Sequence, residues 1–292
     1  MSTTRLVRTI GMLLLAITSL HTTSAQSAGS ITLQDTMTAE DWRLTMHPDG
    51  VDPSEEFALI LTMDAQADVH VATVEFNSSE NELDIYYPPD FDFAHALPTV
   101  FMVPAINDQS MVGYSGTGFR DFRTAVDYAT LCAASGMAAV LFECASQPYF
   151  VAKDVLNYVA ANHDRLHIDP DRFGILSVSG QAQTALTLLS HADIEAVDWV
   201  RAFVALYPHI ESVPRPATTP DVLLVTAGSD LPQRRTLVDR AIARLQFYGI
   251  EPSIVEYPAG VHHFDSAMNT EQSRDAIQAA LDFLAAELDV GM

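Results

Sequence analysis

The chain has 292 residues, of which 48% are hydrophobic, and its mean hydropathy is +0.12. These values fit one large globular domain or two small ones. The formal net charge is −23, from 38 acidic against 15 basic side chains. This excess of negative charge disfavours partners that are themselves polyanions, such as nucleic acids and anionic membranes.

The first residues have the pattern of a secretory signal. Arg5 and Arg8 precede the apolar run IGMLLLAITSL (10–20), and HTTSA, rich in small residues, follows it. A basic start, a short apolar core and a small-residue end are typical of an export signal. We therefore expect residues 1–25 to be cleaved off after Ala25 and the protein to be secreted or periplasmic.

A buried or membrane-spanning helix is the alternative for this segment, but the apolar run is too short to cross a bilayer. No cysteine follows the run, and no later segment is apolar enough to span a membrane. The sequence therefore predicts no stable membrane anchor.

Residues 26–66 are polar and acidic and are interpreted as an N-terminal extension, ahead of a domain that spans residues 67–292. The extension contains one apolar run, FALILTM (57–63). Hydrophobic periodicity does not decide between a strand and a short helix for a run of this length.

From Val71 the hydrophobic pattern indicates an α/β domain. The segments VATVEF (71–76) and ELDIYY (82–87) flank a polar turn and predict an antiparallel hairpin. Later strands are predicted where continuous apolar runs occur, at 99–103, 137–142, 173–178, 202–207, 221–226 and 253–257. Helical patterns separate these runs. Apolar strands that alternate with helices indicate a mostly parallel sheet, here of about eight strands, with helices on both faces.

The two cysteines lie on either side of one predicted strand. Cys132 comes near the start of the strand at 137–142, and Cys144 comes just past its end. A strand of about six residues separates its ends by roughly 20 Å, whereas a disulfide needs Cα atoms within about 7 Å. We expect both thiols to be free, although export would permit a disulfide.

Three kinds of reactive side chain come directly after predicted strands. Ser179, Asp230 and the pair His262–His263 each follow a different apolar run, in this order along the chain. Ligands of parallel sheets bind at the carboxyl ends of the strands. We therefore expect these side chains to converge at one edge of the sheet.

These residue types suit nucleophilic catalysis. A serine hydroxyl is a weak nucleophile at neutral pH and needs an adjacent base. His262 can take the proton of Ser179, and Asp230 can orient the imidazole and stabilise the imidazolium. An oxyanion needs preorganised N–H donors, for which we select the backbone amides of Gly180 and of Ile106, in the loop after strand 99–103.

The motifs resemble those of the α/β-hydrolase superfamily, most closely its dienelactone-hydrolase-like and esterase members. The most specific are IDPDRFGI (168–175), ahead of the serine, and the Gly-x-His-x-Phe pattern at 260–264. The resemblance extends from about Val71 to the last residues of the sequence. It implies an α/β-hydrolase fold, Ser179, Asp230 and His262 as catalytic triad, a small ester as substrate, and no cofactor.

The sequence departs from the family pattern at two places. The oxyanion loop often carries His-Gly in such proteins, and here the matching pair is Pro104-Ala105. The serine is commonly set in Gly-x-Ser-x-Gly, and here Ser177 and Gln181 occupy the glycine positions. Ser177 is small, as the close approach of strand and helix requires, while Gln181 is not. Gly180 is expected to relieve the turn.

Further residues are possible substrate contacts. Glu143 follows a strand near the predicted site, Tyr149 lies in a loop above the sheet, and His263 adjoins the predicted base. We expect no metal site, because adjacent residues on the His262 loop rarely share one ion and no zinc-peptidase motif occurs.

Two alternatives to an esterase remain open. A serine peptidase on the same fold usually carries a large N-terminal propeller or a lid, and residues 26–66 are too few for a propeller. A non-catalytic relative that binds a ligand or partner in the same cleft is favoured by the altered turn and opposed by the intact Ser–Asp–His order. The sequence does not indicate an oligomeric state.

Overall fold

The apolar runs form the strands of one sheet in the computed structural model, which describes residues 57–76 and 81–291. The predicted signal, most of the predicted extension and the hairpin turn at 77–80 lie outside the described residues. The strands are β1 (His70–Phe76), β2 (Asn81–Tyr87), β3 (Leu97–Met102), β4 (Ala138–Phe142), β5 (Ile168–Val178), β6 (Val200–Leu206), β7 (Asp221–Ala227) and β8 (Ser253–Tyr257).

The sheet has the order β1-β2-β4-β3-β5-β6-β7-β8. β1 and β2 form the predicted antiparallel hairpin, and β2 is also antiparallel to β4. All the remaining pairs are parallel. The mostly parallel sheet of about eight strands is therefore confirmed, and its parallel strands end at a common edge.

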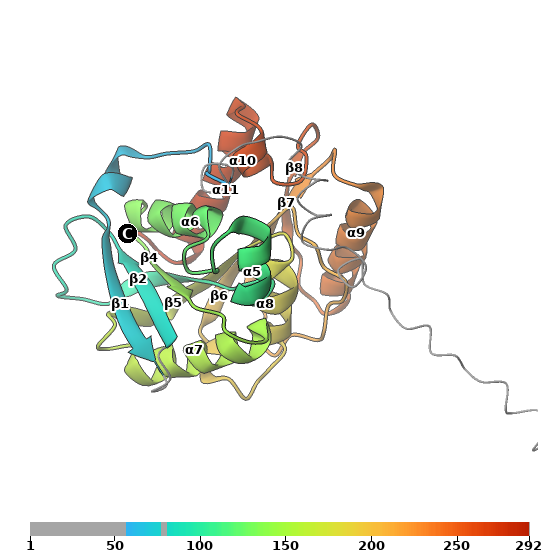
Figure 1. Cartoon of the computed structure of the whole chain (residues 1–292). Coiled ribbons are helices and arrows are strands. Elements are labelled where there is room, and N and C mark those ends of the chain that lie inside the picture. The colour runs from blue at the N-terminus through green and yellow to red at the C-terminus, as the bar shows by residue number, and fades with distance from the viewer. Residues whose placement is uncertain (1–56, 77–80, 292) are drawn as a thin grey trace, which may run out of the picture.

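Helices cover both faces of this sheet (Figure 1). They are α5 (Asp108–Ser115), α6 (Arg123–Ala134), α7 (Pro148–Asn162), α8 (Gln181–Leu189), α9 (Pro232–Phe247), α10 (Phe264–Ala267) and α11 (Glu271–Glu287), with 3-10 turns η1 (Asp64–Asp68) and η2 (Glu195–Val197). Side chains alternate along each strand. Phe101 and Phe203 therefore pack in the core with α7, α8 and α9, whereas Met102 and Val204 pack with α6 and α11.

The apolar run at 57–63 forms neither a strand nor a helix; it is an irregular segment that leads into η1. Phe57 and Leu59 are buried in the core against α6. Leu59 N–H donates to Asp127 Oδ2 at 2.9 Å, and Thr124 Oγ1 donates to Phe57 O at 2.8 Å; Asp127 and Thr124 are both on α6. Ile60 N–H donates to Asp265 O at 2.9 Å. Burial of this run therefore comes from packing on α6.

Both cysteines are free and buried, as the strand geometry predicts. Cys132 lies on α6, and Cys144 lies in the loop that follows β4. Burial raises the pKa of each thiol to about 12, so both are protonated at neutral pH and weakly reactive. None of the helices formed by residues 57–76 and 81–291 is long and apolar enough to cross a membrane.

Candidate active site

Ser179 lies in the sharp turn between β5 and α8. Its φ of +50° places a non-glycine residue in the left-handed region, a conformation that costs of order 1–3 kcal/mol and persists only where the surroundings hold it. Here Ser179 N–H donates to Leu206 O at 3.0 Å, and Ser179 O accepts from His209 N–H at 2.9 Å. The turn thus presents the hydroxyl at the carboxyl edge of the sheet.

The residues around this turn are closely packed. Ser177 is fully buried and donates its hydroxyl to Val204 O at 3.1 Å. A Cβ added to Gly180 would lie only 3.3 Å from Cβ of Ala105. The small residues at 105, 177 and 180 therefore let the loop after β3 and strand β6 approach the serine.

Gln181 behaves differently from the sequence-based expectation, which treated its side chain as bulk to be relieved by Gly180. The side chain is buried, and its Oε1 accepts a hydrogen bond from Val178 N–H at 3.1 Å. It folds back across the turn toward β5. The position that is commonly glycine is therefore occupied by a residue that bonds to the turn itself.

A chain of two hydrogen bonds joins the three predicted triad residues. Ser179 Oγ lies 2.8 Å from His262 Nε2. His262 Nδ1 lies 2.7 Å from Asp230 Oδ2. Asp230 Oδ1 accepts from Leu231 N–H at 2.7 Å, and Arg234 Nη1 lies 3.3 Å from it. The fold therefore brings together three residues that are far apart in the sequence, in the order serine, histidine and aspartate.

Two glycines let the loops that carry Asp230 and His262 lie against each other. A Cβ on Gly228 would lie 2.6 Å from the backbone of Pro258, and one on Gly260 would lie 2.5 Å from the Tyr257 ring. Backbone bonds join these loops: Gly228 N–H donates to Tyr257 O at 2.8 Å, and Ser229 N–H to Gly260 O at 2.9 Å. The glycine of the Gly-x-His-x-Phe pattern is therefore required by packing.

Burial and charge set the protonation of the pair. Burial lowers the pKa of His262 below its ordinary value, and this outweighs the hydrogen bond to Asp230, which raises it; the nearby Arg234 lowers it further. For Asp230, burial raises the pKa, but the hydrogen bond and charge of His262, together with Leu231 N–H and Arg234, bring it below its ordinary value. At neutral pH His262 is neutral and Asp230 is ionised, the states that a base and its orienting acid need.

The two amides selected for an oxyanion site lie on facing segments. Gly180 is the N-cap residue of α8. Ile106 lies in the loop between β3 and α5, one residue after Ala105, whose side chain faces Gly180. Both amides therefore belong to backbone that borders Ser179.

The predicted substrate contacts differ in their surroundings. Glu143 accepts a hydrogen bond from Glu82 N–H at 3.2 Å, and its other oxygen lies 3.7 Å from Arg120. The Tyr149 ring stacks obliquely on His191, 4.8 Å away. Only His263 touches the hydrogen-bonded chain, because its ring lies 4.6 Å from that of His262. The Glu143 carboxylate is thus engaged in an ion pair. Tyr149 does not lie in a loop, as the sequence suggested, but in the first turn of α7, and its ring contacts His191 in the segment that follows α8.

The sequence alone did not indicate Arg234, His209 or Tyr207 as residues of the site, and it indicated Gln181 only as a departure from the family pattern. Arg234, in the first turn of α9, is the one with a local signal, since it comes only four residues after Asp230, which lies just before the helix. The hydrogen bonds of His209 to Ser179 and of Gln181 to Val178 cannot be predicted from hydrophobic periodicity. Tyr207 packs its ring 5.0 Å from His262.

Beneath His262 lies a buried cluster of one acid and two tyrosines. Tyr207 Oη and Tyr128 Oη donate to Asp265 Oδ2, at 2.6 and 2.8 Å. Burial raises the pKa of Asp265 to about 6, although both tyrosines lower it. The cluster joins the ends of β6 and of the His262 loop to α6, and so fixes the floor of the site.

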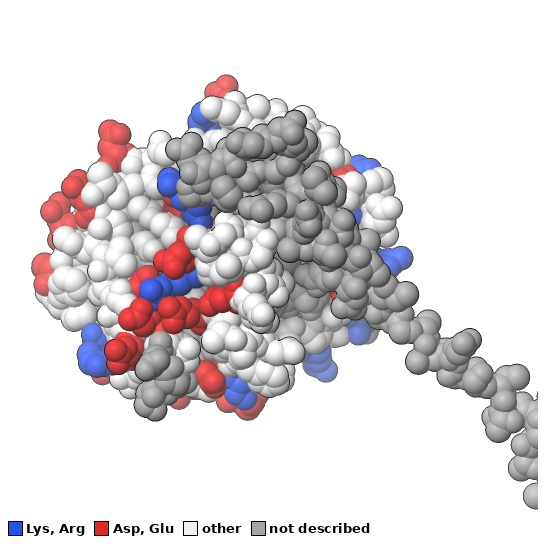
Figure 2. All heavy atoms as spheres, viewed as in Figure 1, with Lys and Arg blue, Asp and Glu red and all other residues white. Residues whose placement is uncertain are grey.

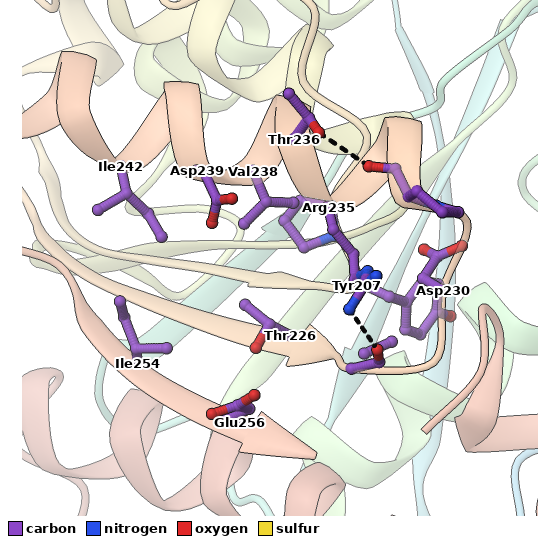
Figure 3. Close-up of a pocket in the computed structure, with 14 residues that line it drawn as sticks. Tyr207, Thr226, Asp230, Arg235, Thr236, Val238, Asp239, Ile242, Ile254 and Glu256 are labelled. Atoms are coloured by element: carbon purple, nitrogen blue, oxygen red, sulfur yellow. Dashed lines mark hydrogen bonds between the residues drawn. The ribbon is translucent and has the colours of Figure 1, made fainter. Parts of the chain in front are cut away.

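A groove of about 540 Å³ opens between α9 and strands β7 and β8 (Figure 3). Asp230 and Tyr207 border it, and Arg235 spans one side to donate to Gly228 O at 3.0 Å. Ser179 is not one of its lining residues. The groove therefore reaches the Asp230 side of the hydrogen-bonded chain rather than the serine hydroxyl.

The described part of the chain holds no group of three or more histidine, cysteine, aspartate or glutamate side chains placed to hold a metal ion. His262 and Asp265, three residues apart in the sequence, have different partners, Ser179 and the two buried tyrosines.

Comparison with known proteins gives likeness in structure alone. No protein-family model and no curated protein matches the sequence. The structure is similar to a serine-to-alanine mutant of LAE6, an α/β hydrolase enzyme from the metagenome of Lake Arreo, Spain. The TM-score is 0.63 at 15% identity, over 97% of this chain and 98% of that one.

Two further solved structures are similar. MGS-M1, an α/β hydrolase enzyme from a Medee basin deep-sea metagenome library, has a TM-score of 0.61 at 17% identity, over 76% of this chain and 99% of that one. Esterase 2 of Thermogutta terrifontis, phosphorylated by paraoxon, has a TM-score of 0.57 at 12% identity, over 76% and 95%. The chain therefore has the α/β-hydrolase fold, as the sequence resemblance implied. Its likeness to dienelactone-hydrolase-like members in particular stays a prediction.

Proposed function

We propose that this protein is a serine hydrolase that cleaves carboxylic esters through Ser179, His262 and Asp230. The observation that carries the proposal is the continuous hydrogen-bonded chain from Ser179 Oγ to His262 (2.8 Å) and from His262 to Asp230 (2.7 Å). The esterases and α/β hydrolases among the similar structures support it.

In the proposed mechanism His262 Nε2 takes the hydroxyl proton while Ser179 Oγ attacks the ester carbonyl. The oxyanion of the tetrahedral intermediate accepts the N–H groups of Gly180 and Ile106. His262 then gives its proton to the leaving alcohol, which leaves an acyl-enzyme. Water activated by His262 hydrolyses this ester and regenerates Ser179. The steps use this chain's own groups, and the substrate we expect is a small ester.

The test is covalent labelling of the serine. Paraoxon phosphorylates a similar esterase, so we would treat the purified protein with paraoxon or a fluorophosphonate and locate the adduct by peptide mass spectrometry. We expect one adduct, on Ser179, and none in Ser179→Ala. Hydrolysis of p-nitrophenyl acetate should fall by about 10³-fold or more in that variant.

The alternatives give other outcomes in the same experiment. A labelled Ser179 with turnover of peptide anilides but not of esters would favour a peptidase. An unlabelled Ser179, under conditions in which a control esterase reacts, would refute the proposal and favour a non-catalytic protein that binds a ligand or partner.

We also propose that the protein is exported, because of the basic and apolar pattern of residues 1–25. Expression of the full chain in a bacterial host should yield a periplasmic or secreted product whose first residue is Gln26, as read by N-terminal sequencing. A product that keeps Met1 and stays in the cytoplasm would contradict this proposal.

A further inference from the structure

The backbone amide just before Ser179 points away from the strand that binds Ser179. Successive amides of a strand point to opposite sides. Since Ser179 N–H donates to Leu206 O on β6, Val178 N–H points toward β3. The paired residues of β3 and β5 end at Met102 and Leu176, two residues short of Val178. Val178 therefore lies past the end of the ladder, in the buried interior.

Gln181 supplies the acceptor for this amide. Its Oε1 lies 3.1 Å from Val178 N, and the side chain is 3% exposed. Gln181 is the first residue of α8. Its side chain turns back past Gly180 and Ser179 to reach the end of β5. Gly180, the N-cap, offers no side chain that could do this.

The bond closes a small ring around the serine. Val178 is the residue before Ser179, and Gln181 is two residues after it, so the hydrogen bond ties together the two ends of the strained turn. The φ of +50° at Ser179 sets the relative orientation of Val178 and Gln181. A turn that relaxed at Ser179 would separate Val178 N–H from Gln181 Oε1 and would also move Oγ relative to His262 Nε2.

We propose that Gln181 is a positioning residue for the nucleophile. Its side-chain carbonyl clamps Val178 N–H and so holds the Ser179 hydroxyl in line with His262. Gln181 occupies the position that is commonly the second glycine of this turn. There its side chain helps to fix the orientation of Ser179. This inference rests on the proposed function, since it assigns Gln181 a role in the reactivity of Ser179.

Two variants separate the clamp from the volume of the side chain. Gln181→Met keeps an unbranched chain of similar length and removes the acceptor. Gln181→Glu keeps a carbonyl-type oxygen at the same place. Gln278→Met, on the exposed side of α11, is the matched control for the same exchange. The first readout is the second-order rate constant for labelling of Ser179 by paraoxon, and the second is hydrogen exchange at Val178 N–H.

We expect Gln181→Met to label roughly tenfold to a hundredfold more slowly than the wild-type protein, as the loss of one buried hydrogen bond suggests. Exchange at Val178 should rise. Gln181→Glu should recover most of the labelling rate, and Gln278→Met should match the wild type in both readouts. A purely structural role would lower the melting temperature of Gln181→Met and leave the labelling rate unchanged, which would overturn the proposal.

If Gln181→Met does not fold, Gln181→Gly takes its place. Glycine is the residue common at this position, and the proposal expects slow labelling there too, whereas a wild-type rate would overturn it. Failure of the proposed function looks different. A wild-type protein that paraoxon does not label refutes the esterase proposal, while the exchange experiment still tests the clamp: unchanged exchange at Val178 in the folded variant would refute it.

Discussion

Arg234 brings a second charge to the pair formed by His262 and Asp230. Its guanidinium lies 3.3 Å from Asp230 Oδ1, and its side chain is 12% exposed. Other ionisable groups near His262 are Asp230 on the loop after β7, His209 and Tyr207 after β6, and His263 beside it. Arg234 stabilises the ionised Asp230 and, as a cation, disfavours a protonated His262. We infer that it extends the range in which His262 acts as a base toward lower pH.

The prediction at this scale concerns the pH profile of ester hydrolysis. In the proposed mechanism His262 must be neutral to accept the proton of Ser179, so kcat/KM should rise as the pH increases through the pKa of His262. Arg234→Gln removes the cation and raises this pKa, so the acid limb should move to higher pH. Stopped-flow or steady-state profiles between about pH 4 and 9 measure it.

Arg240→Gln is the matched control, since Arg240 is an exposed residue of the same helix and its loss changes the net charge by the same amount. Its profile should coincide with that of the wild-type protein. Equal shifts in both variants would mean that the overall charge, rather than the contact with Asp230, sets the pKa.

At the scale of elements, the Tyr128–Asp265–Tyr207 cluster ties α6, β6 and α10 together under the site. Asp265 is fully buried, and its Oδ1 has no hydrogen-bond partner among the described residues. Its pKa of about 6, against an ordinary 3.8, means that the folded state favours the protonated carboxyl. The contribution of this group to stability is therefore full below about pH 4 and is lost as the pH rises through 6.

This gives a prediction for Asp265→Asn. The amide keeps an oxygen for the two tyrosines and cannot ionise. Two pKa units correspond to about 3 kcal/mol. The unfolding free energy of the variant, relative to that of the wild type, should therefore increase by about this amount from pH 4 to pH 7. Urea titrations at several pH values measure it.

Asp275→Asn, on the exposed side of α11, serves as the comparison and should show little change in this difference. If the difference between Asp265→Asn and the wild type stays constant with pH, Asp265 has an ordinary pKa in the folded protein, and the account of the cluster is wrong.

At the scale of the whole molecule, negative charge dominates. The formal net charge is −23, with 38 acidic and 15 basic side chains, and Figure 2 shows acidic side chains gathered in several places on one face. One cluster of acidic side chains surrounds Arg120. The Arg120 guanidinium contacts Glu82 and lies 3.5 Å from Asp84 and 3.7 Å from Glu143. A single cation among three carboxylates leaves this region negative.

Self-repulsion of such a surface is screened by salt. We therefore expect the melting temperature to rise by a few degrees, equivalent to roughly 1 kcal/mol, between low ionic strength and about 1 M sodium chloride. Sucrose stabilises folded proteins without screening charge and gives the baseline for general solute effects. A melting temperature that rises equally with sucrose and with salt of the same osmolality would contradict the electrostatic explanation.

The sequence predicted most of the framework from local patterns. Continuous apolar runs identified the parallel strands, because strands covered on both faces carry no polar alternation. Ser179, Asp230 and His262 could be selected because each follows such a run, and parallel strands end at one edge. The irregular segment at 57–63 could not be assigned, since burial of Phe57 depends on α6, more than sixty residues further along the chain.

What the sequence determined by itself was the α/β class, the strands and the position of the serine, aspartate and histidine after them, since these follow from hydrophobic periodicity and chain order. Only the tertiary structure decided that the three side chains form one hydrogen-bonded chain, that Gln181 bonds to Val178 and that Asp265 is clamped by two tyrosines. Hydrogen bonds depend on distances of a few tenths of an ångström between groups from different elements. Such distances are set by packing of the whole domain, and no local pattern encodes them.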